Sequence, residues 1–594
     1  MMSYKDTSGT GKGVKPAASV PPGTPAEFVL DTLSLEAQVA CALQVPWNTR
    51  QDVIMQSSEA RRLIQALPSE EVFWMVKQRG IEDSLPLIAR TSHEQFQYLV
   101  DLDCWKHDQL VPDACLAWYR ILGRCNQSKV LEWFQQADDC LLVAGLKQFV
   151  HVYKIEEESD ISEEYDAMPS CTIDGINYLR FTTEDAQLVL LPLLRVLYAH
   201  DAGRYQSLIE GIIWDSRVEA EDEALRWRLN RTAENGFPLF DEALALYQPC
   251  DPQEMEQPAA VSSGLQRHQH PQTLSPDQMR YAIAGNGMPV FLQKVLGAPC
   301  DCALPSEFEQ QFVATANKVM VADCREVNEL DDVRRSLRKT AGYLAIGLEH
   351  LCNGDPVAAR AQLACHHPQQ LFRCGYSLIN AVAERVRRHS GHVWTSDGAR
   401  FSALYGTPLA DTALGLSRSR PLFFEGLVSH GSSMYRDFET LAEVEAAEDA
   451  VSRLITADRL LFEWAGFDIT TLQKAYIRSG AIGDPAELSM HSLLATLIVA
   501  RSLDLDRPVP FLEAGDLQEF ASRFTATVAA DRVDLFAGQA AALLTADMAR
   551  PIVDERVLRD LVRDCLAPLF ELLEADGISS TDPLYREAVL VQPA

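Results

Sequence analysis

Asp101, Asp103 and His107 are the residues of this 594-residue chain whose types and spacing most resemble a ligand-binding site. Two carboxylates one residue apart, with an imidazole four residues further on, have the chemistry that binds a divalent cation. The alternative interpretation is structural. In it the two acids end one helix and begin the next as exposed side chains, while Trp105 packs beneath them. We adopt the structural interpretation, because a short motif match in one sequence often arises by coincidence.

A second set of residues has the types that zinc prefers, since zinc takes four nitrogen or sulfur ligands. Its members are His350, Cys352, Cys365, His366, His367 and Cys374. Their spacing matches no standard zinc motif, and a histidine at the C-terminal end of a helix commonly interacts favourably with the helix dipole. The pair Cys300 and Cys302 has a gap of one residue, shorter than the usual two to four. His268 and His270 are too few for a metal-binding tract. We therefore assign no metal site.

The recurrent motifs of cofactor and catalytic sites are missing from the sequence. No Gly-x-Gly-x-x-Gly follows a strand pattern, and neither a Walker loop nor a Gly-x-Ser-x-Gly elbow occurs. No nucleophile has a recognisable base. We predict no catalytic residue and no cofactor, and we favour a protein that is not an enzyme. An active site assembled from residues far apart in the sequence would show no such motif.

Composition and charge argue against several classes of protein. The formal net charge of −31 argues against binding to nucleic acid, because proteins that bind nucleic acid neutralise its phosphates with clustered Lys and Arg. No stretch approaches the roughly 20 apolar residues of a membrane span, and the first residues lack the apolar core of a secretory signal. The 14 cysteines are scattered singly. These features predict a protein of the reducing cytoplasm.

The elements that position these residues are predicted to be helices. Between residues 60 and 122, apolar side chains recur at three- and four-residue steps, which indicates short helices with one buried face. Pro68 suits a helix start, Gly80 suits a helix end, and Ser92 with Gln95 predicts a capping box. The short links favour a helical-repeat, solenoid-like stack. The predicted fold class is mainly α.

The chain is predicted to form two domains. Residues 1–24 resemble a disordered tail, 25–248 form an N-terminal helical-repeat domain, 249–275 a flexible linker rich in Pro, Gln and Ser, and 276–594 a C-terminal helical domain. The acidic run 155–166 is predicted to be a solvated loop. Asp174-Gly175 between β-prone residues predicts one small β-hairpin near 172–181. Residues 337–364 predict a helical hairpin that turns at Asn353-Gly354. Residues 516–546 are predicted to be helical, and 391–420 irregular.

Several segments resemble a bacterial family known as domain of unknown function 6178. They are LPSEEVFWMVKQRGIEDSLPLI, SHEQFQYLVDLDCWKHDQL, ENGFPLFDEALALYQP, GLEHLCNGD, LFRCGYSL and the terminal DPLYREAVLV. Together they span most of the chain, and membership implies no activity. The segment 60–122 also resembles, more distantly, the intracellular helical domain of MgtE-type magnesium transporters, which repeats Leu-Pro-x-Glu-Glu at helix starts as residues 67–71 do here.

The preferred function is an interaction scaffold or adaptor in the cytoplasm with protein partners, because stacked helices form extended binding surfaces. The alternative is a regulatory protein that responds to divalent cations, motivated by the transporter resemblance and the negative charge. An enzyme with an unrecognised site is the third hypothesis.

Overall fold

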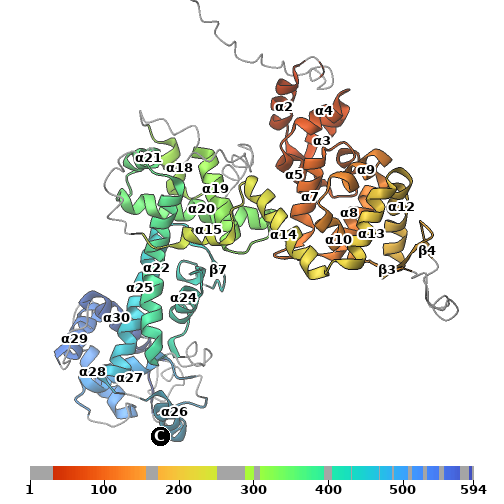
Figure 1. The fold of residues 1–594 in the computed structure, drawn as a ribbon. Helices are drawn as coiled ribbons and strands as arrows, with labels where there is room; N and C mark the ends of the chain where they lie inside the picture. The colour runs from red at the N-terminus through yellow and green to blue at the C-terminus, as the bar shows by residue number, and fades with distance from the viewer. Residues whose placement is uncertain are drawn as a thin grey trace, which may run out of the picture. The chain divides into compact units, whose positions relative to one another are not determined.

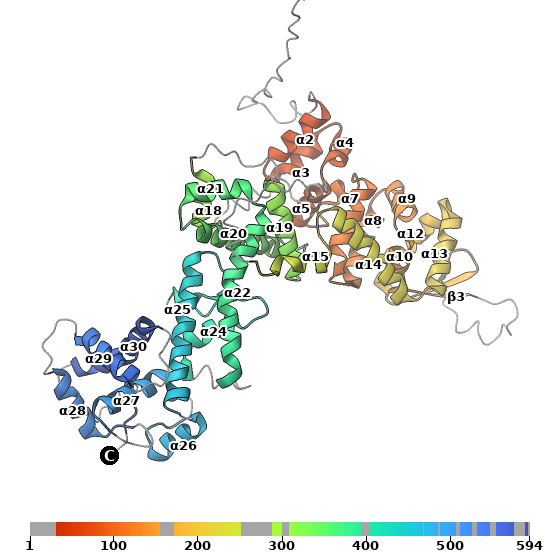
Figure 2. The same cartoon turned by 60° about the vertical axis from the view of Figure 1, so that its left-hand side comes forward.

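A computed structural model gives the fold of the chain (Figures 1 and 2). The structure describes residues 31, 33–154, 171–250, 288–299, 308–393, 404–429, 431–466, 468–484, 487–505, 511–525, 532–546, 554–574 and 588–591. Helices dominate these ranges and strands are short, so the mainly α prediction is confirmed. The solenoid-like stacking stays a prediction.

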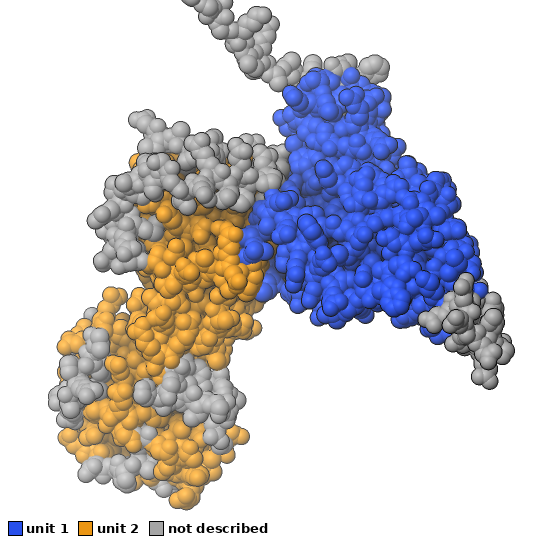
Figure 3. Space-filling view, in the orientation of Figure 1, with its two compact units in different colours: residues 1–239, 268–281, 323–333 blue, residues 240–267, 282–322, 334–594 orange. Residues whose placement is uncertain are grey.

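The chain divides into two compact units (Figure 3). Unit 1 comprises residues 1–239, 268–281 and 323–333, and unit 2 comprises 240–267, 282–322 and 334–594. The predicted tail 1–24, the acidic run 155–166 and all but two residues of the predicted linker 249–275 lie outside the described ranges. The predicted domain limits therefore stay predictions.

Unit 1 is built from helices linked by few residues and from two small sheets. Its helices are α2 (Leu35–Gln44), α3 (Trp47–Gln56), α4 (Ala60–Ala66), α5 (Ser69–Arg79), α6 (Leu85–Ile88), α7 (His93–Asp103), α8 (Pro112–Arg124), α9 (Gln127–Gln136), α10 (Asp139–Lys147), α12 (Glu184–His200), α13 (Ala202–Trp214) and α14 (Arg217–Glu234). Its strands are β1 (Trp105–Lys106), β2 (Gln109–Leu110), β3 (Val150–Lys154), β4 (Cys171–Thr172) and β5 (Asn177–Phe181).

Local sequence signals set the ends of the helices in unit 1. The Ser92 hydroxyl accepts a hydrogen bond from the Gln95 N–H, and the Gln95 side chain accepts one from the Ser92 N–H, which confirms the predicted capping box. Helix α5 ends at Gly80, whose φ of 94° suits glycine. These short helices hold α7 and the acids at its end in place.

The larger sheet of unit 1 has the order β3-β5-β4, with all pairs antiparallel. Strands β4 and β5 form the predicted hairpin, and the Asp174 carboxylate accepts hydrogen bonds from the N–H groups of Ile176 and Asn177 in its turn. Strand β3, which pairs with the other side of β5, was not predicted from the sequence. The second small sheet, β1-β2, follows α7 directly.

Unit 2 is also helical. Its elements are α15 (Phe240–Leu244), the 3₁₀ helix η2 (Ala245–Tyr247), α18 (Val290–Gly297), α19 (Phe308–Ala322), most of α20 (Leu330–Leu351), α21 (Pro356–Cys365), α22 (Pro368–Val393), α24 (Leu409–Leu416), β6 (Phe423–Phe424), η3 (Glu425–Leu427), β7 (Tyr435–Arg436), α25 (Leu441–Asp458), the π-helix η4 (Arg459–Trp464), α26 (Ile469–Ser479), α27 (Met490–Ser502), α28 (Ala514–Thr525), α29 (Arg532–Ala546) and α30 (Glu555–Glu574). Helix α24 lies inside the stretch 391–420 that was predicted to be irregular, so that prediction is wrong there.

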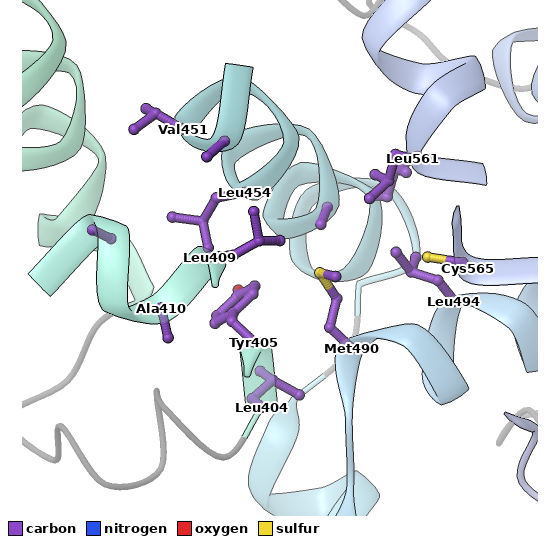
Figure 4. Close-up of a cluster of buried hydrophobic side chains, with 14 of the residues drawn as sticks. Leu404, Tyr405, Leu409, Ala410, Val451, Leu454, Met490, Leu494, Leu561 and Cys565 are labelled. Carbon is purple, nitrogen blue, oxygen red and sulfur yellow. The ribbon is translucent and has the colours of Figure 1, made fainter. Parts of the chain in front are cut away.

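The core of unit 2 gathers side chains from helices far apart in the sequence (Figure 4). Leu409 of α24, Leu454 of α25, Met490 of α27 and Leu561 of α30 are all buried in one cluster. Burial of such side chains contributes about 1.5–3 kcal/mol each, so this cluster is what holds the four helices together.

Helices α20 and α22 approach each other through glycine. A Cβ added at Gly375 would lie 2.0 Å from the Tyr343 carbonyl oxygen, and one added at Gly347 would lie 2.4 Å from the Leu371 carbonyl oxygen. Only residues without a side chain allow backbones this close. The predicted helical hairpin is confirmed as α20 and α21, with Asn353 and Gly354 at positive φ in its turn.

Candidate functional site

Asp101 lies inside unit 1 and is only 2% exposed, so its interpretation as an exposed helix-end acid was wrong. Its carboxylate accepts hydrogen bonds from Arg231 of α14 through Nε at 2.6 Å and Nη2 at 2.9 Å. The Gln97 amide donates a third at 2.9 Å. Burial raises the pKa of the Asp101 carboxyl, while the hydrogen bonds from Arg231 act in the opposite direction. Asp101 is therefore the buried acid of an ion pair that joins α7 to α14.

The arginines of α14 extend this network. Arg231 also pairs with Asp138, which precedes α10. Arg228 donates from Nε to the Asp101 carbonyl oxygen at 2.7 Å, and its guanidinium lies 5.4 Å from the centre of the Trp105 ring. Trp105 is 2% exposed, as the structural interpretation predicted. Arg228 and Arg231, about one helical turn apart, thus join α14 to the end of α7.

Asp103 has different partners from Asp101. Its carboxylate accepts hydrogen bonds from Lys77 Nζ and from the Trp118 indole N–H, each at 2.9 Å. The His107 Nε2 lies 3.8 Å from a carboxylate oxygen of Glu326, not beside either aspartate. Both aspartates are thus neutralised by basic side chains. The structure does not bring Asp101, Asp103 and His107 together as one cation site.

The residues of the zinc-like set are not gathered either. His350 and Cys365 are exposed, whereas His366 and Cys374 are buried. His367 Nδ1 accepts a hydrogen bond of 3.1 Å from the Gln369 N–H. Across the described ranges, no group of three or more His, Cys, Asp or Glu side chains is arranged to hold a metal ion. Cys300, Cys302, His268 and His270 lie outside those ranges.

A constellation that the sequence did not reveal lies in unit 2. Asp458, the last residue of α25, accepts hydrogen bonds from the Tyr405 hydroxyl and, at 2.7 Å, from His389 Nε2 of α22. Burial raises the pKa of Tyr405. The π-helix η4 begins at the next residue, and such helices are frequent at functional sites. No local motif links positions 389, 405 and 458, so only the fold could reveal them. Since no nucleophile is identified beside them among the described residues, we describe the three as a buried polar junction.

An exposed aromatic side chain is the other feature missed by the sequence reasoning. Trp214, at the end of α13, is 74% exposed, although tryptophan usually buries most of its surface. Its indole N–H donates a hydrogen bond of 2.7 Å to Glu210, which also accepts one of 3.0 Å from Lys154. The ring is therefore held at the surface by a defined contact.

Comparison with known proteins gives a family without an assigned activity. The model of the family described as "Family of unknown function (DUF6178)" matches residues 29–592. Neither a curated protein nor a solved structure matches the chain. Because the match spans almost the full length, the chain belongs to this family, as the sequence resemblance implied. The more distant likeness to the MgtE domain stays a prediction. A helix long and apolar enough for a membrane crossing is not found in the described ranges.

Proposed function

Taking membership of this family as the premise, we propose that the chain is a cytoplasmic interaction protein, a scaffold or adaptor that binds a protein partner through the Trp214 surface. We define this surface by three exposed residues of unit 1, Trp214, Val218 and Ile176. The free thiols of the cysteines in the described ranges support a reducing compartment.

The exposed indole of Trp214 is the observation that carries the proposal. Tryptophan is enriched among the residues that dominate binding energy at protein interfaces. A side chain that is already held by Glu210 loses less conformational freedom on binding, which favours affinity.

Two further exposed apolar side chains of unit 1 are included in the proposed surface. Val218 lies four residues further on and is 68% exposed. The Glu210–Lys154 ion pair joins α13 to the end of β3, where Lys154 pairs with Asn177 across the sheet. Ile176 directly precedes Asn177 and is also exposed. This series of contacts links the turn that carries Ile176 to the helix that carries Trp214, which is why we include Ile176 in the proposed surface.

The charge of the sequence that follows Lys154 suggests the chemistry of the partner. The acidic run 155–166 follows Lys154 directly in the chain. A partner with an apolar centre and a basic rim would match both the indole and the acids, since complementary charge steers association. The divalent-cation hypothesis has less support. Asp101 and Asp103 already pair with Arg231 and Lys77, which removes the reason for a cation site there.

The test is capture of partners by the tagged full chain, with quantitative mass spectrometry of wild type and variants. Trp214→Ala and Val218→Ser should lower recovery of the same partner at least about tenfold, the loss of roughly 1.4 kcal/mol or more that is typical of a central interface residue. Trp227→Ala is the matched control, because Trp227 is also exposed but lies nine residues after Val218, on the opposite side of α14. Equal recovery with all variants, each verified to be folded, would overturn the proposal.

A further inference from the structure

A short apolar segment, residues 588–591, is buried inside unit 2. It consists of Ala588, Val589, Leu590 and Val591, and all four side chains belong to the large hydrophobic cluster of the unit. Residues 575–587, which link the segment to α30 along the chain, lie outside the described ranges. The hydrogen bonds of Leu590 show which elements hold the segment.

Leu590 is bound through both of its backbone groups. Its N–H donates a hydrogen bond of 2.8 Å to the Thr496 hydroxyl of α27, and its carbonyl oxygen accepts one of 3.0 Å from the N–H of Leu512, which precedes α28. Val591 then forms a parallel β-bridge with Leu512. We call the place between Thr496 and Leu512 that receives residues 588–591 the segment site.

The segment site offers one acceptor and one donor in apolar surroundings. Thr496 and Leu512 are both fully buried. The Thr496 hydroxyl gives its own proton to the Ser492 carbonyl oxygen at 2.5 Å, so it meets the segment as an acceptor, while the Leu512 N–H is the donor. Buried polar groups need a partner, because leaving them unsatisfied is unfavourable. Main-chain hydrogen bonds of this kind give affinity in peptide recognition, and the burial of side chains gives specificity.

We propose that the segment site is a peptide-binding site, that residues 588–591 of the same chain occupy it, and that the same segment of a second copy of this chain binds it in their place. The ligand is a short apolar peptide. A charge at the position of Leu590 is excluded, because burying an unpaired charge is strongly unfavourable. The second copy is the occupant that matches the site at every residue. The segment site is independent of the Trp214 surface.

Occupation by the chain itself sets the affinity of the site for a separate peptide. A linked segment binds as if it were present at an effective concentration, which is on the order of 1 mM for a short link. For the segment to be bound in about 99 of 100 molecules, the same peptide must bind the vacated site with a dissociation constant of about 10 μM or lower. In the intact chain the peptide must first displace the linked segment, so its binding is roughly 100-fold weaker there.

The test introduces a specific protease site within residues 577–583 of the full chain and cuts it after folding. A fluorescent peptide of residues 584–594, which stands for the segment of a second copy, should exchange with the cut fragment. Fluorescence anisotropy should give a dissociation constant of about 10 μM or lower, and at least about tenfold weaker binding to the uncut chain. The peptide with Leu590→Asp should not bind. Absence of binding to the folded, cut chain would overturn the proposal, as would equal binding to cut and uncut chains.

Variants of the chain give a second measurement in case the cut chain does not stay folded. Uncut Leu590→Asp cannot place its own segment in the site, so the wild-type peptide should raise its melting temperature, because a ligand that binds only the folded state stabilises it. Thr496→Val removes the acceptor for the Leu590 N–H and should weaken peptide binding about tenfold. Thr456→Val is the matched control, because the Thr456 hydroxyl donates to the Ser452 carbonyl oxygen just as Thr496 does to Ser492, but Thr456 lies in α25 and has no hydrogen bond to residues 588–591. Equal peptide affinity of these two folded variants would overturn the proposal, as would a Leu590→Asp chain that the peptide does not stabilise.

Discussion

Arg231 donates to Asp101 from Nε at 2.6 Å although 130 residues separate the two in the chain. Removing one member of a buried ion pair leaves the other charge uncompensated, which typically costs 3–5 kcal/mol. We expect Asp101→Asn and Arg231→Ala each to lower the free energy of unfolding of unit 1 by about that amount.

Urea denaturation of both single variants and of the double variant measures this coupling. The double variant should lose much less than the sum of the singles, because it leaves neither Asp101 nor Arg231 without the other. Arg226→Ala, at an exposed position of the same helix, is the control and should change stability by less than about 0.5 kcal/mol. Additive losses would contradict the pairing.

Trp105 should be needed for its bulk and not for its indole N–H. Trp105→Ala is expected to destabilise unit 1 by about 3–5 kcal/mol, as truncation of a large buried aromatic does. The indole N–H of Trp105 has no hydrogen-bond acceptor among the described residues. Trp105→Phe should therefore cost clearly less than Trp105→Ala, which thermal and urea unfolding can measure.

Trp118 provides the comparison for Trp105, because its indole N–H does have an acceptor. Trp118→Phe removes the hydrogen bond to Asp103, which is worth about 1.5–3 kcal/mol for a charged acceptor. If Trp118→Phe and Trp105→Phe cost the same, the hydrogen bond to Asp103 does not contribute as the structure indicates.

Glu70 should make unit 1 less stable as the pH rises through neutrality. Burial raises the pKa of its carboxyl from 4.5 to about 7, and the neighbouring Glu71 carboxylate adds to the shift. Below pH 4.5 the carboxyl is protonated in both the folded and the unfolded state, so it has no effect on stability. Between 4.5 and 7 the folded state holds more protons, so stability falls with pH, by about 3 kcal/mol in total.

Glu70→Gln removes this titration and keeps the shape of the side chain. The variant should match wild type at pH 4.5 and exceed it by up to about 3 kcal/mol at pH 8 in the free energy of unfolding. Glu59→Gln is the control, because Glu59 is exposed. Parallel stability curves for wild type and Glu70→Gln would show that Glu70 does not titrate near neutrality in the folded protein.

Gly375 should tolerate no side chain. In Gly375→Ala, the new Cβ would meet the Tyr343 carbonyl oxygen at 2.0 Å, so α20 and α22 must separate. Overpacking of this kind typically costs 1–3 kcal/mol or more. Gly538→Ala in α29 is the matched control, because nothing lies within 4 Å of its added Cβ, and it should gain about 0.5–1 kcal/mol. Thermal unfolding of the two variants compares them directly.

The features predicted from sequence are those that depend on neighbouring residues. The Ser92–Gln95 capping box, the Gly80 helix end and the Asp174-Gly175 turn each involve groups within a few positions of one another. A single sequence carries that information, because the turn or cap chemistry is decided locally.

The features missed are those in which the fold brings together distant residues. Strand β3 pairs with β5, which lies more than 20 residues further along the chain. Asp101 has the sequence signature of an exposed helix-end acid, but the fold buries it against Arg231. The candidate cation site failed for the same reason, since its carboxylates pair with basic residues that no local pattern indicated. Exposure of Trp214 is also a property of the assembled helices and not of its own segment.

The distance in sequence between Asp101 and Arg231 has a consequence for how the protein is made. The ribosome releases α7 well before α14, so the buried carboxylate has no cationic partner from α14 until residue 231 has emerged. Contacts between residues far apart in the chain form late and slowly, and unpaired intermediates are prone to aggregation. The helices between residues 60 and 122 therefore complete their packing only with α14, and a nascent chain halted before Arg231 would be a substrate for chaperones or proteases.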